Sequence, residues 1–174
     1  MEALPLVGRW KQKWDVGDVF IVPQKDGMWS IGQILEAVCI PPTSRMRRPN
    51  IVTCAFYDIR CSSDCNNIKL PLPFDKLISS LSVPRWSLDS GAWKVIVRGQ
   101  PVTLERMYWA NEQFREQDWV GSSDYSPSVV EGFLNAFYGL EPWDDYYDPN
   151  ILDSLLMSPD KKPKHVILKR QTQG

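Results

Sequence analysis

The clearest pattern of hydrophobic and polar positions lies near the start of the chain, where two apolar runs flank a short polar segment. The runs are Val19 to Val22 and Met28 to Leu35, and both are rich in β-branched and aromatic residues. The polar segment ends in Asp26-Gly27, a pair that tolerates the positive φ angles of a tight turn. The pattern therefore predicts a β-hairpin, and Gly32 in its second strand predicts a bulge or a close backbone approach on a curved sheet.

Further short apolar runs follow at the spacing of strands. Ile51 to Tyr57 is almost wholly apolar, which is typical of a strand buried on both faces. Trp93 to Val97 predicts another strand, whereas Phe74 to Leu81 fits either a short helix capped by Asp75 or an edge strand. Because no long helical pattern lies between these runs, they favour an antiparallel sheet or a small SH3-like barrel over βαβ units.

Helical patterns appear in the second half of the chain. Ser128 and Glu131 have the spacing of a capping box, and Gly139 ends the apolar stripe that follows. A second helix is predicted to begin with Asp148 as its N-cap, followed by Pro149. The two apolar stripes are Val129, Val130, Phe133, Leu134 and Phe137 in the first helix, and Ile151, Leu152, Leu155 and Leu156 in the second.

Two other segments of this half have weaker patterns. Leu104 to Val120 mixes aromatic and charged residues with poor periodicity, which favours a helix only slightly. His165 to Leu168 predicts a short strand.

Together these patterns predict a single domain of the mainly β (α+β) class, with helices appended at its C-terminal side. The expected parts are a β-rich core over residues 16–98, an acidic α-rich extension over 104–168 packed on it, and a mobile tail over 169–174. A chain of 174 residues, 43% of them hydrophobic, can bury a substantial core.

Charge is distributed unevenly along the chain although the formal net charge is only −1. Residues 112–160 contain eleven acidic residues and one basic residue, Arg115, whereas the segments before and after are net positive. An acidic surface of this kind disfavours binding to nucleic acid or to an anionic membrane and favours a basic partner.

The sequence offers little for catalysis. His165 is the one histidine, and the chain has neither a Gly-x-Ser-x-Gly elbow nor a glycine-rich phosphate-binding motif. Paired carboxylates such as Asp144-Asp145 stand among other acids, which is typical of exposed, mutually repelling charges. Arg45, Arg47 and Arg48 lie in a polar loop and are typical of a solvated surface. We therefore expect a non-enzymatic protein that needs no cofactor.

Four cysteines leave alternatives open. Cys61 and Cys65 have a spacing close to that of zinc ligands, and Cys39 and Cys54 could complete a four-thiolate site. The last two lie in apolar contexts, where a free cysteine usually behaves as a small buried hydrophobe, and Cys61 could instead pair with Cys65. So few cysteines, together with a start of the sequence that has no apolar run of signal-peptide length, predict a cytoplasmic protein.

The strongest candidate for a binding site is a short segment in which aromatic and acidic residues alternate. Tyrosine and tryptophan are enriched where interfaces have their strongest contacts, and acidic neighbours steer a basic partner. The alternative is that the aromatic rings pack on the protein's own sheet and the acids cap helices, and each interpretation can hold for different residues. The candidate partner-binding residues are Glu141, Trp143, Asp144, Asp145, Tyr146, Tyr147 and Asp148.

Part of the chain resembles the immunity protein 26 family of bacterial polymorphic toxin systems. The resemblance covers residues 16–97, with a weaker similarity at Asp148-Pro149-Asn150. It rests on Gly17-Asp18 before the first strand, Pro23 after it, Phe56-Tyr57-Asp58 at the end of a later strand, and Trp93 to Ile96. It implies a β-rich protein that binds a cognate toxin in the producing cell and blocks its active site, a nuclease with a basic cleft being one candidate.

A second function class is a general interaction module. Such a β-barrel module reads a peptide or a modified lysine through an aromatic cage. The rings available for a cage are Trp10, Trp14, Trp29 and Tyr57.

Overall fold

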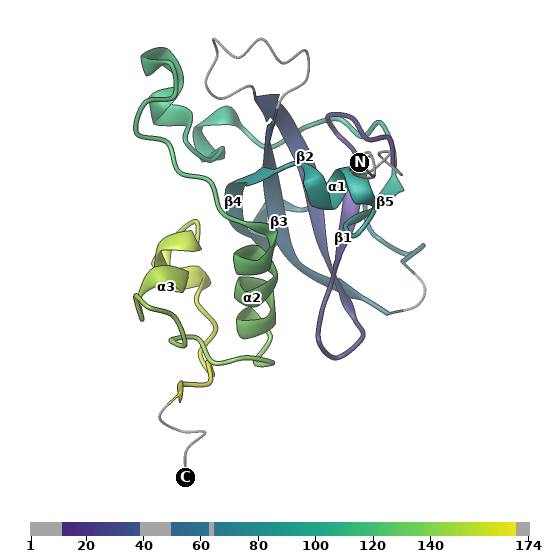
Figure 1. Ribbon diagram of the computed structural model, residues 1–174. Helices are drawn as coiled ribbons and strands as arrows, with labels where there is room; N and C mark the ends of the chain where they lie inside the picture. Colours follow the sequence, from purple (N-terminus) through teal and green to yellow (C-terminus); the bar gives the residue numbers. More distant parts are fainter. Residues whose placement is uncertain (1–11, 39–49, 63–64, 170–174) are drawn as a thin grey trace, which may run out of the picture.

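A computed structural model describes residues 12–38, 50–62 and 65–169 (Figure 1). Within these residues, five strands form one antiparallel sheet in the order β4-β3-β2-β1-β5. Every neighbouring pair of strands is antiparallel, so the predicted antiparallel sheet is confirmed. β4 and β5 lie at opposite ends of the order, so the described strands form an open sheet. The strands are β1 (Val19–Pro23), β2 (Trp29–Val38), β3 (Ile51–Cys61), β4 (Leu77–Pro84) and β5 (Lys94–Val97).

The predicted hairpin is formed by β1 and β2. Gly27 has a φ of +81°, and the Asp26 carboxylate accepts a hydrogen bond of 3.1 Å from the backbone N–H of Met28. Asp26 and Gly27 therefore supply the two properties that a tight turn needs, a side-chain acceptor and a left-handed backbone.

Gly32 makes room for an aromatic ring rather than for a bulge. It pairs with Phe20 across β1 and β2, and the shifts in register of β2 against β3 lie on either side of it, between Ser30 and Ile31 and between Ile34 and Glu36. A Cβ atom at Gly32 would lie 2.5 Å from the ring of Phe20. The expected close approach is present, and a side chain makes it.

Both faces of the sheet are buried. Along β1, Phe20 and Val22 belong to one core and Val19 and Ile21 to the other, and none of the four is more than 6% exposed. A strand with this pattern needs cover on both sides, because its side chains alternate between the faces. We call the two cores the helix-side core and the loop-side core.

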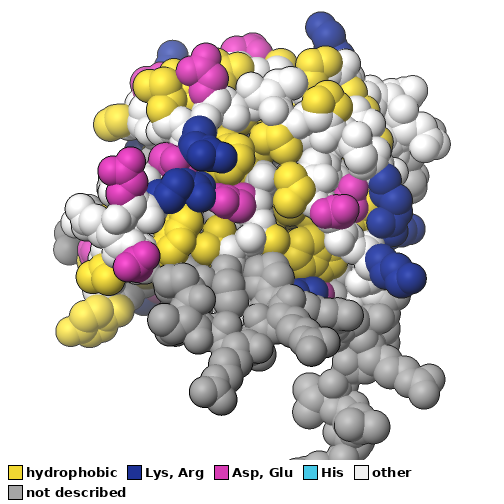
Figure 2. Space-filling view, turned by 90° about the horizontal axis from the view of Figure 1, so that it is seen from above, with side chains coloured by type: hydrophobic (Ala, Val, Ile, Leu, Met, Phe, Trp, Pro, Cys, Tyr) yellow, Lys and Arg dark blue, Asp and Glu magenta, His cyan; other side chains and the backbone are white. Residues whose placement is uncertain are grey.

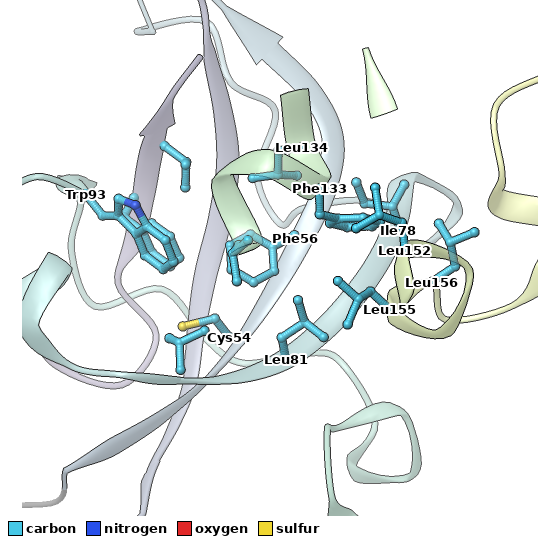
Figure 3. Packing of buried hydrophobic residues seen from close by; sticks show 14 of the residues in the cluster. Cys54, Phe56, Ile78, Leu81, Trp93, Phe133, Leu134, Leu152, Leu155 and Leu156 are labelled. Atoms are coloured by element: carbon cyan, nitrogen blue, oxygen red, sulfur yellow. The ribbon is translucent and has the colours of Figure 1, made fainter. Parts of the chain in front are cut away.

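The helix-side core is covered by three helices, α1 (Trp86–Ser90), α2 (Pro127–Phe137) and α3 (Ile151–Leu155). Trp93 is one of the two tryptophans in this core and stacks on Phe20, with 5.5 Å between the ring centroids. Figure 3 shows Phe133 and Leu134 of α2 and Leu152 and Leu155 of α3 pointing towards the sheet. The predicted apolar stripes therefore identify the sides of α2 and α3 that pack on it.

The helix caps differ from the prediction. Helix α2 begins at Pro127 with Ser126 as its N-cap, and Ser128 and Glu131 do not form a capping box. The Glu131 carboxylate instead accepts a hydrogen bond of 2.9 Å from the Trp93 indole. Helix α3 has Asn150 rather than Asp148 as its N-cap. Gly139, with a φ of +72°, follows the end of α2 as expected.

The loop-side core is covered by irregular chain and 3₁₀ helices. Phe74 to Leu81 contains both alternatives, η1 (Phe74–Lys76) followed by the start of the edge strand β4. The expected helix over 104–120 is replaced by η2 (Arg106–Tyr108) and η3 (Glu112–Gln117), and η4 (Pro159–Lys161) follows later. The prediction of a strand at 165–168 was wrong. Buried side chains from the loops, Leu72 and Leu104, seal this face.

Replacing Gly32 by alanine tests the packing between β1 and β2. The added Cβ would collide with the Phe20 ring, which is fully buried and cannot move away freely. We expect the free energy of unfolding to fall by about 1–3 kcal/mol, the usual range for an overfilled core. Thermal and urea denaturation of the purified protein measure this change.

A double mutant identifies the cause. Phe20→Leu removes the ring that the new Cβ would meet. Gly32→Ala should therefore destabilise the Phe20→Leu protein less than it destabilises the wild type. Additive losses would show that Gly32 is needed for another reason.

Candidate partner-binding site

Residues 141–148, which we call the acidic-aromatic segment, lie in the connection between α2 and α3 (Figure 1). The end of α2 is held to the hairpin turn by two hydrogen bonds. Gln24 donates to the carbonyl of Leu134 at 3.2 Å, and the amide side chain of Asn135 accepts from the backbone N–H of Lys25 at 3.1 Å. The segment therefore begins from a fixed position.

Trp143 belongs to the core and not to the surface. Its side chain is 1% exposed, and its ring centroid lies 5.9 Å from that of Phe133. The indole N–H donates a hydrogen bond of 3.1 Å to Asp153. For Trp143 the structure thus supports the alternative that the ring packs on the protein itself, and its place among the candidate surface residues is corrected.

Tyr146 is half buried against α2. A side chain at Gly132 of α2 would collide with the Tyr146 hydroxyl. Burial raises the pKa of Tyr146, and the nearby carboxylates of Glu141 and Asp145 act in the same direction. Tyr146 therefore anchors the segment to α2, and Trp143, which is buried more completely, anchors it to the core.

Each carboxylate of the segment forms an ion pair or accepts a hydrogen bond within the chain. Glu141 forms an ion pair with Lys25. Asp144 accepts a hydrogen bond of 2.7 Å from the backbone N–H of Lys169, and Asp145 lies 2.7 Å from the ammonium group of the same lysine. Asp148 accepts a hydrogen bond of 2.9 Å from the backbone N–H of Asn150. Lys169, which was expected in a mobile tail, is thus held by two neighbouring carboxylates.

Three residues of the segment form its outer surface. Tyr147 is fully exposed, with a relative accessibility of 107%, and Asp145 and Asp148 are exposed beside it. We call these three residues the tyrosine-acid surface. An exposed tyrosine flanked by carboxylates offers a large flat contact area, a hydroxyl group and negative charge to a partner.

The other residues proposed from the sequence do not come together in a site. His165 is exposed, and Cys61 is joined to Cys65 in a disulfide. Cys54 is fully buried, and this burial raises the pKa of its thiol far above the ordinary value. Among the described residues no group of three or more His, Cys, Asp or Glu side chains is placed to hold a metal ion. Cys39 and the three loop arginines lie outside the described residues.

The disulfide bears on where the protein acts. Structural disulfides persist mainly in oxidising compartments, and in the cytosol they are usually transient. The Cys61–Cys65 bond was one of the alternatives left open by the sequence. The cytoplasmic location stays a prediction.

The aromatic cage is not assembled from the rings that the structure describes. Trp14 packs against the helix-side core, whereas Trp29 packs against the loop-side core and Tyr57 forms part of it. These rings lie on opposite faces of the sheet, so they cannot surround one ligand. Trp14 instead lies beside Arg85 and donates a hydrogen bond of 2.8 Å to Asp89. Trp10 lies outside the described residues.

One cluster of charges had no signal in the sequence. Arg115 of η3 forms ion pairs with Glu112 at 2.8 Å and with Glu36 of β2 at 2.6 Å, and its guanidinium lies over the ring of Trp119. Figure 2, which views the end of the molecule where β2 finishes, shows basic and acidic side chains close together around hydrophobic ones. Arg115, the one basic residue of the acidic segment 112–160, is therefore paired with two carboxylates, one of which lies outside that segment.

Comparison with known proteins gives no match, either to a protein-family model, to a curated protein or to a solved structure. None of the helices in the described part of the chain is long and apolar enough to cross a membrane.

The pH dependence of stability tests the anchor of the acidic-aromatic segment. Lys162, 2.8 Å away, and then the Trp143 indole hold the pKa of Asp153 below its ordinary value of 3.8. A carboxyl group of this kind stabilises the fold at neutral pH, and the contribution is lost as the pH falls through the lowered pKa. Asp153→Asn should therefore lower the unfolding free energy at pH 7 by up to about 1 kcal/mol, since the pair is partly exposed.

Urea unfolding at neutral and acidic pH measures the difference between variant and wild type. It should shrink as the pH falls below 3.8, where the wild-type carboxylate also becomes neutral. Asp124→Asn, at an exposed position outside the acidic-aromatic segment, is the control and should change stability little. A difference that stays constant with pH would mean that the charge of Asp153 does not act as described.

Proposed function

We propose that this chain is a non-enzymatic immunity protein that binds a cognate toxin protein and blocks its active site. The resemblance of residues 16–97 to the immunity protein 26 family supplies the class of partner and the cytoplasm of a bacterial cell as its place of action. The observation that carries the binding role is the tyrosine-acid surface, with Tyr147 fully exposed between exposed carboxylates.

The exposure of Tyr147 is unusual for so large a ring on a segment that is otherwise well anchored. Trp143 and Tyr146, which precede Tyr147 in the chain, face the protein, and the backbone leading to Tyr147 is therefore held in place. An aromatic side chain on a rigid support loses little entropy on binding, which favours its use as a contact residue. Tyr147 is thus presented to a partner rather than packed against the chain.

Charge gives this surface its expected specificity. Asp145 and Asp148 attract a basic partner over a distance, and such attraction raises the association rate more than it raises the affinity. In this structure the Lys169 ammonium group forms an ion pair with Asp145. A basic side chain of the toxin would replace Lys169 as the partner of Asp145, because this carboxylate is already placed to pair with a positive charge.

Recovery of the partner is the first experiment. The tagged protein is expressed in the cells of its source, captured, washed at low and at high salt, and the retained proteins are identified by mass spectrometry. A single secreted protein with a toxin domain, retained in stoichiometric amount, supports the proposal. Recovery of many unrelated proteins, or of none, contradicts it.

The double substitution Asp145→Asn and Asp148→Asn tests the role of charge. Asparagine keeps an oxygen acceptor for the turn at Asn150, so folding should be preserved. We expect association with the captured toxin to slow by about 2- to 10-fold at low salt, and the salt dependence of the rate to weaken. Biolayer interferometry over a range of ionic strengths measures both quantities.

A matched control has the same change in net charge. Glu116→Gln with Asp124→Asn also removes two exposed negative charges, on η3 and in the connection after it. If this control slows association equally, the total charge matters and the tyrosine-acid surface is not the binding site. Tyr147→Ala should act differently and mainly speed dissociation, because it removes contact area rather than charge.

A further inference from the structure

A slot of about 480 Å³ lies along the outer edge of β4, and no residue of the tyrosine-acid surface is among the residues that line it. The middle of β4, from Ser80 to Ser82, forms its floor. One wall comes from η2 and the chain that follows, including Tyr108 and Asn111, and the other from α3 and the residues after it, including Ser154. The volume is within the usual range for a ligand pocket.

The backbone of β4 points hydrogen-bonding groups into this slot. β4 is the last strand of the sheet on this side, and its N–H and C=O groups alternate between β3 and the outside. The backbone N–H of Arg85 donates to the carbonyl of Asn50, just before β3, so the backbone groups of Arg85 point towards β3. Because the direction alternates along the strand, those of Val83 and Leu81 also point towards β3. Ser80 and Ser82 therefore direct their backbone groups outward, as does Pro84, which needs no N–H partner.

The chain itself already pairs with this edge at two points. The backbone N–H of Tyr125 donates to the carbonyl of Ser82 at 2.9 Å, and that of Met157 donates to the carbonyl of Ile78 at 2.9 Å. Between them, within the described residues, no hydrogen bond reaches the outward N–H and C=O of Ser80. The open stretch from residue 78 to residue 82 is about 13 Å long at 3.3 Å per residue.

The lining is polar without being charged. Among the described residues that line the slot none is Asp, Glu, Lys, Arg or His, although 24% of the whole chain is charged. Hydroxyl and amide groups alternate there with the aromatic rings of Tyr108, Trp109 and Tyr125. A ligand with a full charge would lose its hydration in this slot without gaining an opposite charge, so the lining suits a neutral ligand that donates and accepts hydrogen bonds.

We propose that the slot binds a short, extended and uncharged peptide segment of a partner protein by strand addition to β4. The central residue of the segment exchanges two hydrogen bonds with the backbone of Ser80, and its neighbours contact the two walls. Tyr125 and Met157 block the edge on either side, which limits the bound stretch to about three residues at the spacing of a strand. The proposal is independent of the toxin-binding function and of the acidic residues.

An array of capped hexapeptides, composed of Ser, Thr, Asn, Val and Gly, is the probe for the first test. A matched array with Asp or Lys at the central positions tests the preference for neutral segments. We expect some neutral peptides to bind the full-length protein with dissociation constants below about 1 mM, and the charged counterparts to bind about tenfold more weakly or worse. In two-dimensional NMR spectra the amide signal of Ser80 should shift on binding.

Substitutions at Ser80 separate the backbone from the side chain. Ser80→Pro removes an N–H that points away from β3, as the backbone at Pro84 does, so the pairing of β4 with β3 loses no hydrogen bond. The substitution should weaken peptide binding by about tenfold. Ser80→Ala keeps this N–H and loses only the bond that the Ser80 hydroxyl accepts from Ala110, 2.9 Å long. Binding to Ser80→Ala should therefore stay within about twofold of the wild type.

A filled slot provides an independent test if Ser80→Pro fails to fold. Ser154→Trp places a large ring at the α3 wall and should abolish peptide binding, whereas Ser128→Trp on the exposed side of α2 should not. Absence of binding to every peptide at about 1 mM, or equal binding by Ser80→Pro and wild type, overturns the proposal. Binding of maltohexaose in place of the peptides also overturns it and identifies the slot as a glycan site.

Discussion

The structure depends on one constraint, that the central strands are apolar on both faces. Along β1 every side chain from Val19 to Val22 is buried, and the two sets of alternate residues belong to different cores. A sheet of this kind is stable only when both faces are covered, because its apolar side chains otherwise remain in water. The rest of the chain is arranged to give this cover, with helices on one face and irregular segments on the other.

The same constraint places the acidic-aromatic segment. Because α2 and α3 both pack on the helix-side core, the chain between them must cross that core, and Trp143 enters it. Trp143 and Tyr146 turn inward, and Tyr147, the next residue, points to solvent. The exposed tyrosine is therefore a consequence of the packing of its neighbours, and the carboxylates around it are held by Lys25, Lys169 and nearby backbone.

Local patterns in the sequence predicted the parts of the fold that are set by periodicity and turn chemistry. The hairpin, the buried strand at 51–57 and the faces of α2 and α3 follow from such patterns. The capping box at Ser128 failed because Glu131 bonds to Trp93, a residue far away in the sequence. Likewise, burial of Trp143 depends on how α2 and α3 meet, and the pattern of residues 141–148 does not contain this information.

The slot at β4 was not visible in the sequence for a different reason. The pairing of β4 with β3 decides that the backbone groups of Ser80 point outward. The serine residues of β4 do not indicate this direction in the sequence. The walls come from residues 107–125 on one side and 154–157 on the other, which the fold brings together.

The segment that contains α3 connects the slot with the tyrosine-acid surface. On one side it bonds to β4, where Ser79 donates to the carbonyl of Leu155 and Met157 to that of Ile78. On the other side Asp153 accepts the indole N–H of Trp143. The two surfaces are thus fixed relative to each other through one short element, yet they differ in physical character. Attraction at the charged surface falls with salt, whereas hydrogen bonding in the neutral slot depends on salt only weakly, so ionic strength separates their contributions to binding.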